Sequence, residues 1–338
     1  MNRQNHTVRR TVVALAAAAA LLGTAGTLPA AAAAHCPGPA VINGHAPTLV
    51  PESAVWDQAH HRFLVGSLRH GTVSAVGLDG GVRTLIDDPG TLIEIAGLRI
   101  DQVHRRILVT NLDNGVGERS GPATLGRVAG IAAYDLDTGR RLYYTDLAAV
   151  AGDGGSHLAN DIAVAPDGTA YVTDSFAPVV YRVDPDGTGS VLLRDDRLTP
   201  APGAYGLNGI AYRDGRLVLG KWDDGTLWQL PLRDPSAVRR VEIADGGALL
   251  HLDGITARPD GALAGATNAF FGSGRDAEVE LRSDDHWHTA RLTAVHPSAD
   301  PTPTAVTTGP GGALYQLSGG LAAANAGHPG DSFTLRRV

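Results

Sequence analysis

Residues 160–175 read NDIAVAPDGTAYVTDS, a segment in which two apolar runs flank the turn sequence Pro166-Asp167-Gly168. This arrangement predicts a hairpin of two buried strands. The segment nevertheless opens with Asn160-Asp161, although Asn and Asp are among the residues least favoured in strands. Strand propensity therefore does not explain why these two residues lead into a buried strand.

Segments of the same kind occur six times, and their first residues are 44 to 64 positions apart. The six segments begin at Glu52, Ala96, Asn160, Asn208, Asp253 and Thr304. Such spacing is typical of propeller blades, and 43 Gly and 20 Pro agree with a turn-rich all-β chain. The sequence therefore predicts a six-bladed β-propeller, with four-stranded antiparallel blades around a central channel. A β-sandwich is the alternative, but it needs fewer strands than this length supplies.

The first 34 residues are typical of a secretory signal peptide. Three arginines precede an apolar, alanine-rich run, and small residues follow up to Ala34. The apolar run is short for a membrane span. The sequence thus predicts a signal peptide over 1–34, one propeller domain over 35–338, and a secreted protein. Arg9-Arg10 leaves open whether export follows the general secretory or the twin-arginine route.

Charge and cysteine content limit the partners. The formal charge is −7, and it becomes −10 without residues 1–34, which carry three Arg and no acid. An acidic protein is a poor candidate for binding nucleic acid or anionic membranes. Cys36 is the only cysteine, which excludes an intramolecular disulfide. A closed propeller has no free sheet edge, so we expect a monomer that acts on a small molecule.

The first residues of the six segments occupy one equivalent position. In a propeller this position lies on the innermost strand, so their side chains would form a ring around the channel. Four of the six are oxygen donors, namely Glu52, Asn160, Asn208 and Asp253. Carboxylates and amides without a partner are costly in a dry channel. The alternative interpretation is that Asn208-Gly209 and Asp253-Gly254 are only turns.

A divalent cation would satisfy all four side chains. A ligand set made only of oxygens, with two carboxylates, favours Ca²⁺, and Mn²⁺ or Mg²⁺ are possible substitutes. Zn²⁺ would require His or Cys. The sequence therefore predicts a Ca²⁺ site at one mouth of the channel.

These segments resemble those of a known family. PESAVW, ANDIAV, LNGIAY and LDGITA, with the PDG turns and YVTDS, are similar to the gluconolactonase, senescence-marker and regucalcin group of six-bladed β-propellers, which is related to the paraoxonases and strictosidine synthases. The resemblance covers essentially all of residues 35–338. It implies that Glu52, Asn160, Asn208 and Asp253 hold a catalytic Ca²⁺ or similar ion. Asn160-Asp161 is closer to the paraoxonase pattern, and the arginine that grips sugar hydroxyls in sugar lactonases has no identifiable equivalent.

The predicted chemistry is hydrolysis of a lactone or related ester. A cation open on one side polarises the carbonyl group and activates water. Asp253 is the first candidate for the base, and Glu52 is the second. His157 and His251 precede ring residues and are candidate proton shuttles, with solvated loop histidines as the alternative.

Loops at the same mouth supply the predicted substrate contacts. Besides the two histidines, these are Asn111, Asp113, Asp174, Lys221, Trp222, Phe270 and Phe271. Two other functions stay open at this stage. One is a binding module in which the metal is structural, and the other is a condensation enzyme of the strictosidine synthase kind.

Overall fold

The computed structural model describes Met1 and residues 38–244, 247 and 249–338. From Gly38 on, these residues belong to one compact unit, His35–Val338. The predicted signal peptide lies, Met1 apart, outside the described residues. No helix among the described residues is long and apolar enough to span a membrane.

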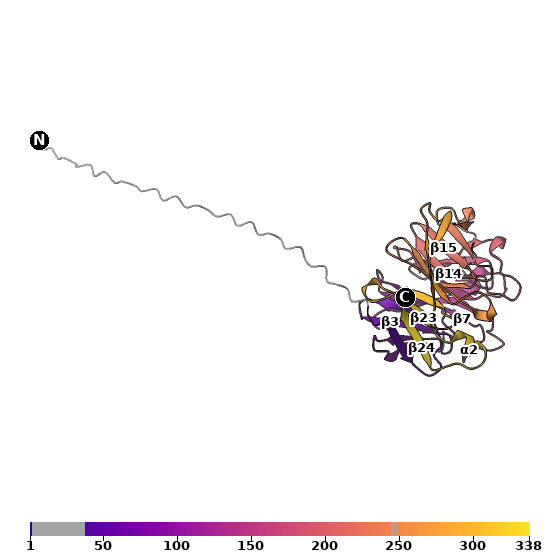
Figure 1. Ribbon diagram of the computed structural model, residues 1–338, viewed down its shortest axis with the longest axis horizontal. Coiled ribbons are helices and arrows are strands. Elements are labelled where there is room, and N and C mark those ends of the chain that lie inside the picture. The colour runs from indigo at the N-terminus through magenta and orange to yellow at the C-terminus, as the bar shows by residue number, and fades with distance from the viewer. Residues whose placement is uncertain (2–37, 245–246, 248) are drawn as a thin grey trace. The chain divides into compact units, whose positions relative to one another are not determined.

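The unit consists mainly of strands (Figure 1). The first three sheets are antiparallel meanders of four consecutive strands. The first contains β2 (Pro51–Asp57), β3 (Arg62–Ser67), β4 (Thr72–Val76) and β5 (Val82–Asp87). The second contains β6 (Leu98–Asp101), β7 (Arg106–Leu112), β8 (Ala129–Asp135) and β9 (Arg141–Asp146), followed by helix α1 (Leu147–Ala151). The third contains β10 (Ala159–Val164), β11 (Ala170–Asp174), β12 (Val179–Val183) and β13 (Gly189–Arg194).

The prediction of six separate four-stranded blades is wrong, because two predicted units form one eight-stranded sheet. Its strands are β14 (Leu207–Arg213), β15 (Arg216–Lys221), β16 (Thr226–Pro231), β17 (Arg239–Ile243), β18 (Leu252–Ala257), β19 (Leu263–Thr267), β20 (Ala277–Arg282) and β21 (Thr289–Pro297). The outer strands β17 and β21 pair in parallel, with Glu242 opposite Thr289 and Ile243 opposite Ala290. This pairing satisfies backbone groups that two separate sheet edges would leave unpaired.

The two ends of the described chain close the fifth sheet. It contains β22 (Ala305–Thr308), β23 (Leu314–Ser318), β24 (Ser332–Arg337) and β1 (Val41–His45) in this order. Helix α2 (Leu321–Asn325) lies between β23 and β24, and the short helices η1 (Asp196–Leu198), η2 (Pro235–Ala237), η4 (Phe270–Gly272) and η5 (Pro310–Gly312) lie in other connections. Because β1 pairs with β24, residues from both ends of this unit stabilise one sheet.

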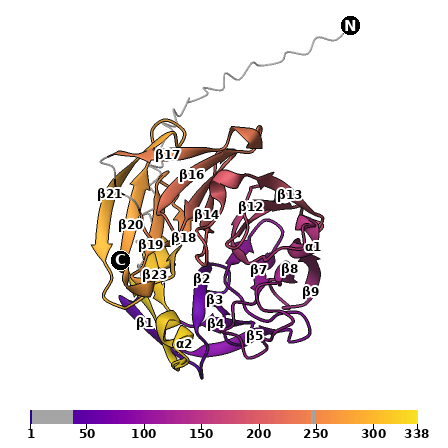
Figure 2. The same ribbon diagram turned by 90° about the vertical axis from the view of Figure 1, so that its right-hand side faces the viewer.

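The inner strands form a closed ring. β2, β6, β10, β14, β18 and β22 contact one another in this order, and β22 contacts β2. Figure 2 shows β2, β14 and β18 near the middle of the compact unit, with β9, β13 and β21 at its periphery. The all-β class is therefore confirmed, and the fold is propeller-like with five sheets among the described residues.

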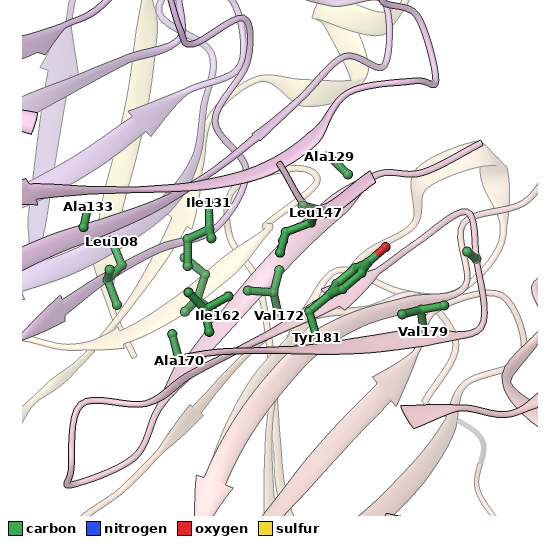
Figure 3. Packing of buried hydrophobic residues seen from close by; sticks show 13 residues of the cluster. Leu108, Ala129, Ile131, Ala133, Leu147, Ile162, Ala170, Val172, Val179 and Tyr181 are labelled. Atoms are coloured by element: carbon green, nitrogen blue, oxygen red, sulfur yellow. The ribbon is translucent and has the colours of Figure 1, made fainter. Parts of the chain in front are cut away.

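The predicted hairpin at Asn160–Ser175 is confirmed. β10 and β11 pair in antiparallel fashion, and Gly168 in the turn has φ 84°. Both faces of β11 are buried: Val172 packs toward the second sheet, whereas Tyr171 belongs to the next hydrophobic cluster. Figure 3 shows Ile131 of the second sheet close to Ile162 and Val172 of the third. Such two-sided burial explains the nearly continuous apolar runs in the sequence.

Candidate metal centre and pocket

A backbone irregularity accompanies each of the four predicted ligands. In β2, β10, β14 and β18 the pairing register shifts where the ligand side chain lies. The shifts fall between Pro51 and Ser53, Ala159 and Ile162, Leu207 and Ile210, and Leu252 and Ile255. The pairings of β6 with β7 and of β22 with β23 are continuous. Because a bulge redirects a side chain, each of the four can face the centre instead of a neighbouring sheet.

Gly209 and Gly254 follow two of the ligands and lie inside strands rather than in turns. A Cβ atom on Gly209 would overlap the carbonyl oxygen of Asp253, and one on Gly254 would approach that of Thr304 to 2.9 Å. Glycine is required at both positions because neighbouring inner strands approach closely. The turn interpretation of these two dipeptides is therefore wrong.

The Asn160-Asp161 pair divides between two environments. Asn160 lines the pocket, whereas Asp161 accepts a 2.9 Å bond from Nη2 of Arg99. Arg99 also donates to the backbone carbonyl of Ile255 on β18 and lines a second opening, formed by other residues of the inner strands. Asn160 thus contributes to the pocket, whereas Asp161 forms an ion pair with Arg99 inside the ring of inner strands. Sequence reasoning missed Arg99, because a single arginine in a strand carries no signal.

Neighbouring side chains fix the orientation of two of the predicted ligands, Asn160 and Asp253. Asn160 donates through Nδ2 to Oγ of Ser175 at 3.0 Å, which leaves its Oδ1 as the acceptor. Oδ2 of Asp253 accepts from Nδ2 of Asn268 at 2.8 Å, which leaves Oδ1. Sequence reasoning missed Asn268, although it follows Thr267 as Asn111 follows Thr110 and Asp174 follows Thr173.

Threonine hydroxyls hold the backbone of the ligand positions. Thr304 donates to the carbonyl of Glu52 at 2.6 Å, Thr110 to that of Asn160 at 2.9 Å, and Thr173 to that of Asn208 at 2.6 Å. Each bond joins neighbouring sheets, so the sheets themselves keep the ligand positions in register.

Two of the four predicted ligand side chains carry an unsatisfied oxygen. Oδ1 of Asn208 and Oδ1 of Asp253 are buried and have no hydrogen-bond partner. Burial, with Asp253 and Asp161 nearby, raises the pKa of Glu52 well above its usual value. Burial likewise raises the pKa of Asp253. Two neighbouring carboxyl groups with raised pKa values, beside the unpartnered amide oxygen of Asn208, form an environment that a divalent cation stabilises. All four side chains are oxygen donors, so this set fits a hard cation such as Ca²⁺.

The ring lies in an open pocket of roughly 480 Å³, which includes its solvent-filled mouth. Apart from the four ligands, most of the lining is apolar, and the polar exceptions are Asn114 and Asn325. The apolar lining consists of Leu68, Ala96, Leu112, Leu158, Tyr205, Trp222, Phe270 and Leu321. None of these lining residues carries a cationic side chain.

Aromatic side chains build one wall. Trp222 stacks on His251 with ring centroids 3.8 Å apart, and Phe271 meets Trp222 edge to face at 6.0 Å. Phe270 lines the pocket, while Phe271 is 69% exposed at a positive φ of 59°. Of the predicted substrate contacts, the structure thus brings Trp222 and Phe270 to the pocket and Phe271 beside them.

The two histidines lie behind the lining. Nδ1 of His251 is 3.1 Å from the carbonyl oxygen of Asn268, and burial lowers the pKa of His251. His157 is held between Asp174, at 2.7 Å, and Asp153, at 2.8 Å. Hydrogen bonding to Asp174 raises the pKa of His157.

The other predicted contacts are engaged within the protein and do not line the pocket. Asn111 bonds the backbone of Thr91 and Ile93. Asp113 accepts from Thr124, Asp174 accepts from three backbone N–H groups, and Lys221 is bound by Asp223 and Asp224. These four side chains stabilise loops and the ends of strands.

Glu94 organises the loop that follows β7 at this mouth. Its buried carboxylate accepts backbone N–H bonds from Asn114, Gly115 and Gly117 at 2.8–3.2 Å. Asn114 in turn lines the pocket. Sequence reasoning missed Glu94, because nothing local distinguishes it from a solvated acid.

The raised pKa of Glu94 predicts that the stability of the protein depends on pH. Burial raises its pKa from 4.5 to about 7. The folded state therefore binds this proton more tightly than the unfolded state, and stability falls as the pH rises from about 4.5 through about 7. We expect Glu94 to contribute about 3 kcal/mol to this loss. The free energy of unfolding, measured with urea across this pH range, should change less with pH for Glu94→Gln than for the unsubstituted protein. An equal change with pH in both proteins would contradict the raised pKa of Glu94.

The fold and the ring define a propeller-like all-β protein with an axial carboxylate–amide site. Mala s 1, an allergen of Malassezia sympodialis, has a similar structure, with a TM-score of 0.71 and 19% identity over 88% of this chain and 96% of that one. A gluconolactonase of Xanthomonas campestris is similar with a TM-score of 0.56 and 18% identity, over 87% of each chain. Regucalcin of Agrobacterium tumefaciens, described as a calcium-binding protein, is similar with a TM-score of 0.57 and 16% identity, over 87% of this chain and 94% of that one. No protein-family model and no curated sequence matches this chain. The predicted resemblance is thus confirmed as a resemblance of fold.

Proposed function

We propose that this protein is a divalent-cation-dependent hydrolase of neutral, apolar lactones or related esters. The observation that carries the proposal is the ring of Glu52, Asn160, Asn208 and Asp253, which lines a largely apolar pocket and contains two unpartnered oxygens, Oδ1 of Asn208 and Oδ1 of Asp253. These four residues would hold the cation, with Ca²⁺ as the first candidate. The gluconolactonase and the calcium-binding protein among its structural neighbours agree with this choice.

A bound Ca²⁺ supplies a Lewis acid that polarises the substrate carbonyl and stabilises negative charge on its oxygen. Asp253 accepts a proton from the attacking water, because Asn268 holds Oδ2 and leaves Oδ1 unpartnered. Water adds to the carbonyl carbon, the ester C–O bond breaks, and the proton passes to the departing alkoxide. A lactone thereby gives a hydroxy acid.

The pocket lining selects the substrate class. Its wall offers leucine and aromatic side chains and no cation. Lys221 cannot bind a substrate carboxylate, because Asp223 and Asp224 already hold its ammonium group. A neutral lactone or ester with an alkyl or aryl group therefore fits better than a polyhydroxylated or anionic one.

Hydrolysis of a matched lactone series tests the proposal. We expect kcat/KM to rise about three- to fourfold for each added methylene that the wall buries, and gluconolactone to be a poor substrate. Removal of divalent ions should lower turnover at least about tenfold, and Ca²⁺ should restore it. Absence of turnover on every lactone and aryl ester, with Ca²⁺ bound, would favour a binding module with a structural ion instead.

A further inference from the structure

Three potential metal ligands lie together on β20 and β21, outside the ring strands. Glu278 and Glu280 are two positions apart on β20, so their side chains leave the same face. His296 on β21 is the direct cross-strand partner of Glu278. One ligand atom from each of the three lies within 4.8 Å of the others.

The carboxylate of Glu278 has no hydrogen-bond partner. The residue is fully buried, and neither of its oxygens accepts a hydrogen bond. On the other side of β20 in the sheet, Ala266 pairs with Glu278 and Ala264 with Glu280. The two alanines pack against Val306, so these neighbours of the two glutamates are apolar. A buried carboxylate is costly in such surroundings unless a cation compensates it.

The neighbours of Glu278 supply both further ligands and an entry path. His296 places Nε2 3.9 Å from Oε2 of Glu278, and its side chain is 55% exposed. An ion can therefore reach the buried carboxylate from solvent along the imidazole. Arg258 pairs with Oε1 of Glu280, and a carboxylate with one oxygen engaged still has acceptor capacity on the other.

We propose that Glu278, Glu280 and His296 form a second cation site, distinct from the ring, that takes Zn²⁺ or a similar transition metal. An imidazole with two carboxylates is a ligand set that Zn²⁺ uses, with water in the fourth position. The ring, by contrast, offers only oxygen. The second ion crosslinks β20 to the outermost strand β21, which joins the two halves of the eight-stranded sheet.

The test is Zn²⁺ binding measured by equilibrium dialysis and elemental analysis, on untagged protein with excess Ca²⁺. We expect one bound equivalent of Zn²⁺ and a higher melting temperature. His296→Ala should weaken Zn²⁺ binding by at least about tenfold. This is the lower end of the loss in metal affinity that follows when a group supporting a metal site is removed. It should leave lactone hydrolysis unchanged. Glu278→Gln should weaken Zn²⁺ binding in the same way.

Three control variants distinguish Zn²⁺ binding at this site from binding by other side chains of the protein. His45→Ala removes another exposed histidine, Cys36→Ser removes the only thiol, and Asp253→Asn alters the ring. Each should retain the Zn²⁺ equivalent. Failure of the unsubstituted protein to bind Zn²⁺, or equal binding by His296→Ala, would overturn the proposal. His296 is exposed, so its variant tests the site even if Glu278→Gln does not fold.

Discussion

Asp253→Asn is expected to lower kcat/KM for lactone hydrolysis by about 10³-fold while the protein stays folded. The substitution keeps the size of the side chain and an oxygen that can accept from Asn268. It removes the negative charge and the proton acceptor that face the pocket. Steady-state kinetics at saturating Ca²⁺, with circular dichroism as the check on folding, measures this effect.

Two further variants serve as controls for Asp253→Asn. Asp284→Asn, at an exposed ion pair with Arg291, should retain full activity. Glu52→Gln should lose cation affinity and regain part of its activity as Ca²⁺ is raised, because Glu52 acts mainly as a ligand. Recovery of Asp253→Asn at high Ca²⁺ would contradict the assignment of Asp253 as the base. Full activity of Asp253→Asn would contradict the site itself.

Arg99→Met is expected to lower the free energy of unfolding by about 3 kcal/mol. Arg99 joins three inner strands: it lies on β6, its guanidinium binds the side chain of Asp161 on β10, and it donates to the carbonyl of Ile255 on β18. Asp161 is only 6% exposed, so the substitution leaves a buried carboxylate without its cation. Urea unfolding measures the loss.

A double-mutant cycle separates the ion pair from lost packing. Arg99→Met combined with Asp161→Asn should be more stable than Arg99→Met alone, because the unpaired charge is removed. If Arg99→Met matches the unsubstituted protein, the pair does not stabilise the ring. If the double variant is the least stable of the set, packing rather than charge dominates.

The local part of the fold could be predicted because each repeat carries its own signals. Apolar runs and a PDG turn specify the hairpin at Asn160–Ser175, and the same pattern recurs along the chain. The number of sheets could not be predicted in this way. The pairing of β17 with β21 depends on two edges meeting in space, and neither strand carries a local mark of its partner.

The substrate contacts show a second limit of sequence reasoning. Asn111, Asp113 and Asp174 lie at or just beyond the ends of β7 and β11 and are polar. Polar residues in such positions are typical of binding sites and of loop stabilisation alike. The structure uses all three to satisfy backbone or side-chain groups of nearby loops. Only the packing of the loops distinguishes the two uses.

The sequence by itself determined the repeated strand pattern, the all-β class and the equivalence of Glu52, Asn160, Asn208 and Asp253, because side-chain alternation and turn chemistry act over a few residues. The tertiary structure alone decided which of their oxygens remain unpartnered, that Arg99 neutralises Asp161, and that leucine and aromatic side chains from distant segments wall the pocket. These features depend on neighbours that are far apart in the chain and meet only when the ring of inner strands closes.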